Sequence, residues 1–126
     1  MVPQKIMVVN DDTQFLRMMD LILSESEYEV KTLFEAGPAF EQICAWMPDL
    51  VIMDVRMATP EDGLDIIEMM RLSSPTVEIP VIVCSADHDR MRGMEEHLRT
   101  ENCWVLLKPF NLNTLNSLVH EVIGPA

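Results

Sequence analysis

Basic residues are scarce in this chain. Its 126 residues include 9 Lys and Arg against 21 Asp and Glu, which gives a formal net charge of -12. A surface this acidic repels phosphate backbones, and this argues against direct binding of DNA or RNA. A solvated surface explains most of the acidic excess. The alternative is that a few of the carboxylates bind a metal ion.

Cysteine pairs and long apolar runs are missing as well. The three cysteines, Cys44, Cys84 and Cys103, form no C-x-x-C pair, and an odd number fits no simple disulfide framework. We therefore expect buried, reduced thiols. The N-terminal residues lack the apolar core of a signal peptide, and no apolar run approaches the ~18 residues that span a bilayer. The expectation is a soluble cytoplasmic protein that does not enter a membrane.

Hydrophobic residues make up 48% of the chain, and they fall into short apolar runs that alternate with longer segments of helical period. The expected strands cover 5–10, 28–34, 50–54, 79–84 and 104–107, and the expected helices cover 13–26, 37–46, 64–72, 88–99 and 111–123. Strict alternation predicts a parallel sheet with helices on both faces. The expected fold is α/β, a flavodoxin-like doubly wound (βα)5 with its five-stranded parallel sheet in the order 2-1-3-4-5. We expect a single domain over 1–126, with a core of about 5–123.

Three of the expected strands run into charged or amide residues. Asn10, Asp11 and Asp12 follow the first strand, Asp54 ends the third, and Lys108 follows the fifth. In an open parallel sheet, chemistry takes place outside the carboxyl ends of the strands. Clustered carboxylates repel one another unless a cation lies among them, and hard oxygen ligands suit Mg²⁺ or Mn²⁺. The Lys108 ammonium would also recognise phosphoryl oxygens.

Each of these positions also has a purely structural interpretation. Ser85, at the end of the fourth strand, can stabilise a turn or donate its hydroxyl to a bound phosphoryl group. A lone Asp after a strand is often a cap, and a lone Lys is often a surface residue. Thr13 and Asp12 are alternative N-caps of the first helix. The Lys108-Pro109 bond is a candidate cis peptide.

The chain resembles the receiver domain of response regulators from two-component phosphorelays over residues 5–123. The matching segments are VVNDD (8–12), PDLVIMDVRM (48–57), DG (62–63), PVIVCSA (80–86) and LLKPF (106–110). Each segment is weak alone, but the five in this order and spacing are specific. The resemblance implies that Asp54 is a phosphoacceptor that attacks a phosphohistidine donor. A histidine kinase or a histidine phosphotransfer protein would supply that donor and would dock on the first helix, around Phe15 to Met19.

The resemblance also implies roles for the neighbours of Asp54. Asp11, Asp54 and the backbone carbonyl of Arg56 would bind Mg²⁺ or Mn²⁺, and Ser85 and Lys108 would contact phosphoryl oxygens. Such a domain is a signalling switch rather than an enzyme, although it can dephosphorylate itself. Phosphorylation would change the face built from the fourth helix, the fifth strand and the fifth helix, where a homodimer, an output domain or a target binds.

The chain departs from the family pattern at several places. Asn10 stands where the family usually has an acid; its amide oxygen could still hold a metal-bound water, and we predict weaker Mg²⁺ binding. The loop after the third strand is one residue longer than usual and has Ala58 in place of the usual proline, for which Pro60 could compensate. Val105 replaces the usual aromatic switch residue. Its neighbour Trp104 cannot substitute for it, because adjacent strand residues face opposite sides of a sheet.

Arg56 and Asp87 flank the expected site, and we hypothesise that they pair across its mouth and slow hydrolysis of the acyl phosphate. The alternative is two unrelated loop charges. A second functional class is a phosphorylation-independent, degenerate receiver that acts as a protein-interaction module, which Asn10 and Val105 favour. A third is a metal-dependent phosphohydrolase with an aspartyl nucleophile. That reading ranks low, because it needs an acid at position 56.

Overall fold

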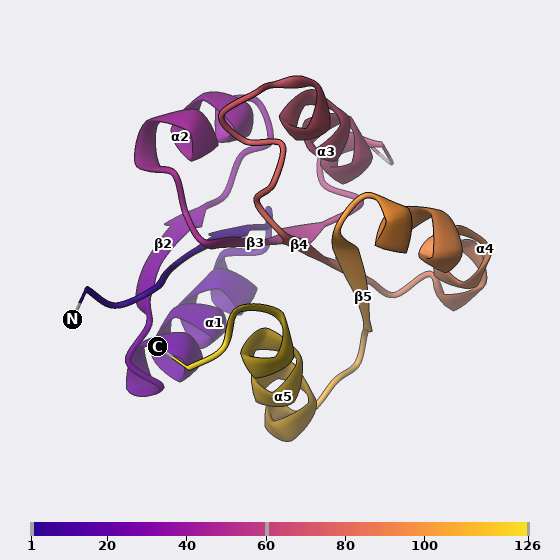
Figure 1. Ribbon diagram of the computed structural model, residues 1–126. Coiled ribbons are helices and arrows are strands. Elements are labelled where there is room, and N and C mark those ends of the chain that lie inside the picture. Colours follow the sequence, from indigo (N-terminus) through magenta and orange to yellow (C-terminus); the bar gives the residue numbers. More distant parts are fainter. Residues whose placement is uncertain (1, 60, 126) are drawn as a thin grey trace.

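Five strands alternate with five helices in the computed structural model, which describes residues 2–59 and 61–125 (Figure 1). The strands are β1 (Lys5–Val9), β2 (Glu29–Leu33), β3 (Leu50–Asp54), β4 (Val81–Ser85) and β5 (Cys103–Leu107), and the helices are α1 (Thr13–Glu25), α2 (Ala39–Trp46), α3 (Asp62–Leu72), α4 (His88–Thr100) and α5 (Leu112–Ile123). Pro60, expected to shape the loop after β3, lies outside the described residues. None of the described helices is long and apolar enough to cross a membrane.

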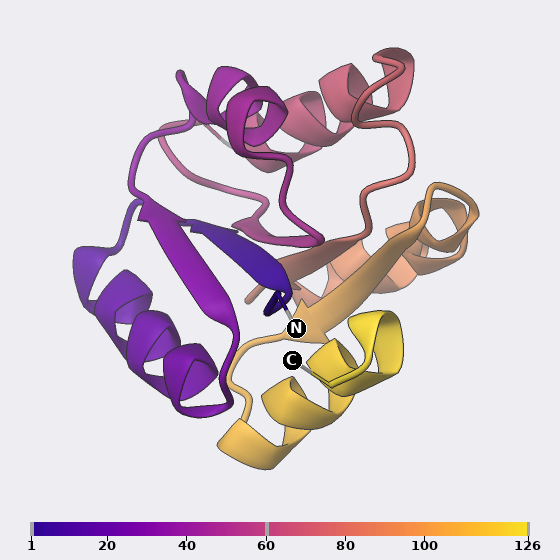
Figure 2. The ribbon, with the colours of Figure 1, turned by 60° about the vertical axis from the view of Figure 1, so that its left-hand side comes forward.

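The strands form one parallel sheet in the order β2-β1-β3-β4-β5. This confirms the predicted α/β fold and its strand order. Helices α1 and α5 cover one face of the sheet, and α2, α3 and α4 cover the other (Figures 1 and 2). Crossover helices on both faces bury the residues of β3 that precede Asp54 and the whole of β4, which explains why each strand is an apolar run up to its last residue.

Alternate residues of the strands supply the two halves of the core. In β3, Val51 and Met53 pack toward α2 and α3, whereas Leu50 and Ile52 pack toward α1 and α5. The edge strand β2 is the least buried, in agreement with its partly alternating sequence. Because the side chains of both faces are buried, the register of β3 is fixed, and its last residue is held at the carboxyl edge of the sheet.

Several element boundaries differ from the predicted ones. Strand β4 begins at Val81 rather than at Ile79, because Pro80 has no N–H for the ladder, and Val81 donates to the Asn102 carbonyl instead. Helix α3 begins at Asp62, two residues earlier than expected. Asn102 adopts the predicted left-handed conformation after α4, with φ of 60°.

The N-cap of α1 and the state of the three cysteines can be compared with the predictions. Asp12, and not Thr13, caps α1: its carboxylate accepts hydrogen bonds from the backbone N–H groups two and three residues later. The cysteines are all free thiols, as expected. Cys84 and Cys103 are buried, but Cys44 is partly exposed, so the expectation of three buried thiols is wrong for Cys44.

Candidate functional site

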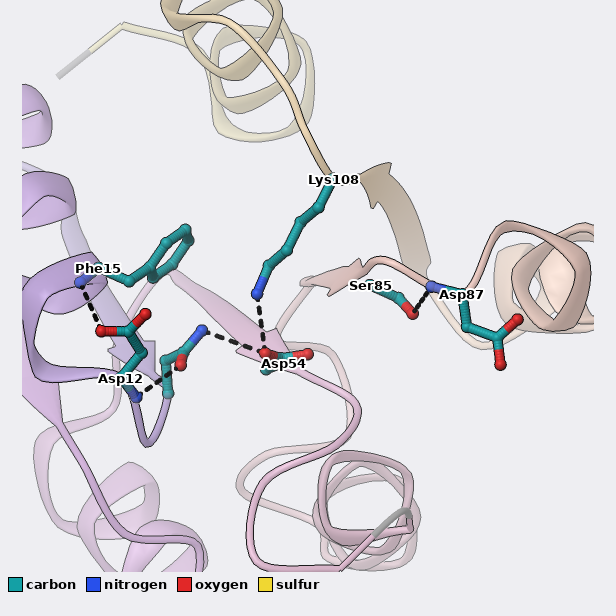
Figure 3. A network of polar contacts seen from close by, with 7 residues as sticks. Asp12, Phe15, Asp54, Ser85, Asp87 and Lys108 are labelled. Atoms are coloured by element: carbon teal, nitrogen blue, oxygen red, sulfur yellow. Dashed lines mark hydrogen bonds and ion pairs between the residues drawn. The ribbon is translucent and has the colours of Figure 1, made fainter.

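The carboxyl ends of β1, β3 and β5 bring Asn10, Asp54 and Lys108 together (Figure 3). Lys108 Nζ lies 2.9 Å from Asp54 Oδ2, and the side-chain amide of Asn10 donates to the same oxygen at 3.3 Å. The Asp54 side chain is 15% exposed. Both recorded bonds use one carboxylate oxygen, and Figure 3 shows the other oxygen directed toward Ser85. Asp54 therefore keeps one oxygen for a ligand.

Lys108 is held in place from several sides. Its backbone N–H donates to the Ser85 carbonyl at 2.8 Å, which continues the β4–β5 pairing. Its ammonium lies 4.8 Å from the centre of the Phe15 ring, a cation–π contact from α1. The Lys108-Pro109 peptide is cis, as predicted. The ammonium is thus fixed between an aromatic face and the Asp54 carboxylate.

Asn10 is a buried hydrogen-bond donor to Asp54. The side chain is 1% exposed, and its Oδ1 accepts the Asp12 backbone N–H at 2.9 Å. The opposite amide orientation would set an NH₂ group against that N–H and an oxygen against the carboxylate. Asn10 therefore presents a neutral donor where a second acid would repel Asp54. Its predicted contact with a metal-bound water would use the remaining lone pair of Oδ1, and it stays a prediction.

Ser85 ends β4 beside the open oxygen of Asp54. Its Oγ accepts the Asp87 backbone N–H at 3.0 Å, and the Asp87 carboxylate in turn accepts the Arg90 backbone N–H at 3.1 Å as the N-cap of α4. Ser85 thus has the predicted structural role in the turn. Its hydroxyl proton is still available for donation, so the structural and functional interpretations are compatible.

A cavity of about 400 Å³ opens beside these residues. Three cationic side chains, Arg56, Arg90 and Lys108, and two carboxylates, Asp54 and Asp87, line it together with Val55, Ser85 and Ala86. Cations therefore outnumber anions here in a chain whose net charge is -12. This balance suits an anionic ligand.

Arg56 and Asp87 line the same cavity. Within residues 2–59 and 61–125, no ion pair joins them. Their pairing in a phosphorylated state stays a prediction.

Arg90 was not anticipated from the sequence. It belongs to the first turn of α4, and its Nη2 lies 2.9 and 3.0 Å from the two carboxylate oxygens of Glu61, at the start of α3. In the sequence it is one of several charged residues on a solvated helix. The available signal was its position five residues after Ser85, in a helix that starts at the site.

The loop after β3 depends on Gly63. A Cβ atom at this position would lie 2.2 Å from the Asp54 carbonyl oxygen and 2.8 Å from Val55 Cα. Asp62 closes the same loop by accepting the Thr59 N–H at 2.7 Å and the Thr59 hydroxyl at 2.8 Å, and these bonds lower the pKa of Asp62. The Asp62-Gly63 pair therefore seats α3 directly against the backbone of the Asp54 strand end.

Cys84 in β4 and the partly buried Val105 and Trp104 in β5 take no chemical part in the site. Cys84 pairs in register with Asp54, and burial raises the pKa of its thiol to about 12. Val105 packs toward α2, α3 and α4, whereas Trp104 packs on the opposite face with α1 and α5, as predicted from strand alternation. Neither a thiolate nor an aromatic side chain of β5 takes part in the site.

The predicted metal ligands are the Asp11 and Asp54 carboxylates and the backbone carbonyl of Arg56. Asp54 offers one oxygen without a recorded hydrogen bond. Asp11 is an exposed carboxylate that follows Asn10 just after the carboxyl end of β1, and Arg56 comes two residues after Asp54. The described residues contain no cluster of three or more His, Cys, Asp or Glu that could hold a metal. Mg²⁺, however, usually keeps several waters and needs only one or two carboxylates. Two carboxylates and a backbone carbonyl fit that preference.

Comparison with known proteins gives one family. The family model described as "Response regulator receiver domain" matches residues 6–120. The two-component response regulator ARR10 of Arabidopsis thaliana is 30% identical over 124 residues, which cover 97% of this chain and 22% of that protein. The transcriptional regulatory protein KdpE of Staphylococcus aureus is 27% identical over 118 residues, which cover 94% of this chain and 49% of that protein. The chain thus spans half or less of these relatives.

Solved structures share the fold. The chemotaxis response regulator CheY4 of Vibrio cholerae superposes with a TM-score of 0.83 and 22% identity, covering 96% of this chain and 99% of that one. The receiver domain of the sensor histidine kinase PA1611 from Pseudomonas aeruginosa superposes with a TM-score of 0.81 and 22% identity. The match covers 98% of this chain and 99% of that one. That receiver domain has a magnesium ion coordinated in its active-site cleft.

Proposed function

Since this chain belongs to the response regulator receiver family, we propose that Asp54 accepts a phosphoryl group and that its phosphorylation switches a partner-binding face. The observation that carries the proposal is the contact of 2.9 Å between Lys108 Nζ and Asp54 Oδ2 at the edge of a cavity lined by Ser85. A fixed ammonium, a hydroxyl donor and a carboxylate with one open oxygen suit phosphoryl transfer, which depends mainly on alignment and charge neutralisation.

The proposed step is a displacement at phosphorus. A lone pair of an Asp54 carboxylate oxygen forms a bond to the phosphorus of a phosphohistidine. The P–N bond breaks, its electron pair returns to the imidazole nitrogen, and an acyl phosphate remains on Asp54. Lys108 and the Ser85 hydroxyl contact the phosphoryl oxygens, where charge must be balanced. Hydrolysis of the acyl phosphate would end the signal, and Arg56 and Asp87 would tune its rate.

Asp11, Asp54 and the Arg56 carbonyl would hold Mg²⁺ or Mn²⁺, with Asn10 acting through a water. When bound, the cation would neutralise charge on the phosphoryl oxygens. Because Asn10 brings an amide instead of a carboxylate, we expect weaker binding than at a site with an acidic pair.

A histidine kinase or a histidine phosphotransfer protein would be the donor, docking on α1. The face of α4, β5 and α5 would bind a second copy, an output domain or a target. Exposed Leu107 and Leu112 on this face favour a protein partner. The acidic surface opposes direct contact with nucleic acid, and we infer a cytoplasmic, non-enzymatic receiver domain over the whole chain.

A degenerate receiver is the second candidate function. The hydrogen bond from the Asn10 amide to Asp54 favours it, because the carboxylate is partly stabilised without any cation. Val105 also favours it, since this residue cannot act as an aromatic switch. Such a module would bind its partner by the same face, independently of phosphorylation.

A small acyl phosphate donor with Mg²⁺ separates these functions, when mass and Trp104 fluorescence are followed. We expect stable, Mg²⁺-dependent uptake of one phosphoryl group that is abolished in Asp54→Asn. The matched control is Asp65→Asn, which makes the same change at an exposed position of α3 and should behave as the parent. No uptake by the parent would favour the degenerate receiver, and continuous hydrolysis of the donor would favour a phosphohydrolase.

A further inference from the structure

The cavity contains a cation that the proposed step does not use. Arg90 lines it together with Asp54, Ser85 and Lys108, but it comes from α4 rather than from the sheet. Its guanidinium contacts both oxygens of Glu61, which precedes α3 and is not among the residues that line the cavity. Arg90 therefore connects the start of α3 to the start of α4, and it also lines the cavity that contains Asp54.

The pairing with Glu61 is suited to exchange. The two side chains are 28% and 58% exposed, and ion pairs in water contribute little to stability. Glu61 stands at the N-cap position of α3 but makes no side-chain capping bond, so α3 does not require this carboxylate. A stronger anion inside the cavity can therefore compete with the Glu61 carboxylate for Arg90.

A phosphoryl group on Asp54 would be such an anion. It adds negative charge and several acceptor oxygens to a cavity that Arg90 already lines, and a planar guanidinium can bond two phosphoryl oxygens at once. Hydrogen bonds to the backbone also connect Ser85, in the site, to the turn that contains Arg90. Ser85 Oγ accepts the Asp87 N–H, and Asp87 caps α4 at Arg90 N–H, so Ser85 and Arg90 belong to one hydrogen-bonded turn.

We propose that Arg90 is a phosphoryl-binding residue of this chain, which moves from Glu61 to the phosphoryl oxygens when Asp54 is modified and draws the first turn of α4 with it. The inference rests on the proposed function of Asp54. The movement of Arg90 would connect the site to α4 without the aromatic switch residue that the family usually has at position 105, where this chain has Val105. Glu61 then acts as a competitor that holds Arg90 in the unmodified state.

The test uses beryllofluoride with Mg²⁺ as the phosphoryl mimic, and it measures affinity by calorimetry and α4 amide shifts by NMR. Arg90→Ala should bind beryllofluoride roughly tenfold more weakly, the effect of one lost charge-assisted hydrogen bond. Glu61→Gln should bind a few-fold more tightly, roughly half of that effect in free energy. The control is Arg92→Ala, which removes the same charge from an exposed position of α4 that does not line the cavity. It should match the parent.

Two results would overturn the role of Arg90. One is equal affinity of Arg90→Ala and Arg92→Ala for the mimic. The other is a gain from Glu61→Gln that persists in the Glu61→Gln/Arg90→Ala double variant, because the competitor should matter only when Arg90 is present. The α4 amide shifts should be lost in Arg90→Ala alone. A parent that does not bind the mimic at Asp54 would overturn the proposed function and this inference together, which is a distinguishable result.

Discussion

An Asp and a Lys lie at each end of β3, but they make different contacts at the two ends. Asp49 precedes the strand and Asp54 ends it. At the first end, Asp49 Oδ2 accepts the Lys5 backbone N–H at 2.7 Å, and Lys5 Nζ donates to the Trp46 carbonyl at 2.6 Å while lying 5.0 Å from the Trp46 ring. At the second end, the Lys108 ammonium contacts the Asp54 carboxylate itself.

The difference lies in what the backbone supplies at each edge of a parallel sheet. At the amino edge, the preceding helix ends, and its last carbonyls attract an ammonium, as the end of α2 at Trp46 does for Lys5. The charged groups of Lys5 and Asp49 are thereby satisfied by the main chain. At the carboxyl edge, the next helix begins, its N–H groups favour anions, and Asp54 faces a cavity. The same residue types are structural at one edge and chemically available at the other.

The largest expected effect separates the two lysines. Lys108→Ala should slow phosphorylation of Asp54 by a small donor about a hundredfold, because one fixed charge at the reacting group is lost. Lys5→Ala should leave that rate unchanged and lower the free energy of unfolding by about 1 kcal/mol. Phosphorylation kinetics and urea unfolding of both variants are the measurements. Equal rates for the two variants would remove the contrast between the edges.

Gly63→Ala tests how tightly the carboxyl edge is built. The added methyl would overlap the Asp54 carbonyl, so we expect a loss of about 2 kcal/mol in the free energy of unfolding. Gly93→Ala is the matched control: a Cβ there meets nothing within 4 Å inside α4, and helix propensity predicts a gain of about 1 kcal/mol. Urea unfolding measures both. Similar changes in the two variants would contradict the proposed close approach.

Asn10→Asp sharpens the electrostatic side of the comparison. Without metal, the variant loses the amide bond to Asp54 and places two carboxylates together, so the free energy of unfolding should fall by about 1 kcal/mol. Mg²⁺ should restore it and should bind about tenfold more tightly than to the parent.

The control for that change is Asn111→Asp. It adds the same charge at the N-cap of α5, where Asn and Asp are equivalent, so neither stability nor Mg²⁺ affinity should change. Thermal unfolding of both variants, in chelator and in a series of Mg²⁺ concentrations, measures their stability and their Mg²⁺ affinity. Unchanged Mg²⁺ affinity in Asn10→Asp would rule out position 10 as part of the metal site.

The smallest effect concerns the thiols. Burial raises the pKa of Cys84 to about 12, so its thiol stays neutral as pH rises and becomes a thiolate only near that value. Iodoacetamide at about pH 8 should therefore label the partly exposed Cys44 and leave Cys84 unmodified, as read by peptide mass. Prompt labelling of Cys84 would mean that the strand end beside Asp54 opens readily.

The fold was predictable because its signals are local. Apolar runs such as the one in β3 identify buried strands, and their alternation with helical segments leads to the parallel sheet, the strand order and the meeting of Asp54 with Lys108. Where the sequence left two caps open for α1, the structure selects Asp12 over Thr13. The failure is Cys44, which the packing of α2 leaves partly exposed.

Sequence alone determined which residues reach the carboxyl edge of the sheet, since strand periodicity and chain order leave them no other place. Only the tertiary structure decided what those residues present to one another. The Asn10 amide is oriented by an N–H two residues away, and Arg90, which lines the cavity, pairs with Glu61 at the start of another helix. Such choices depend on distances between elements, which no single stretch of sequence encodes.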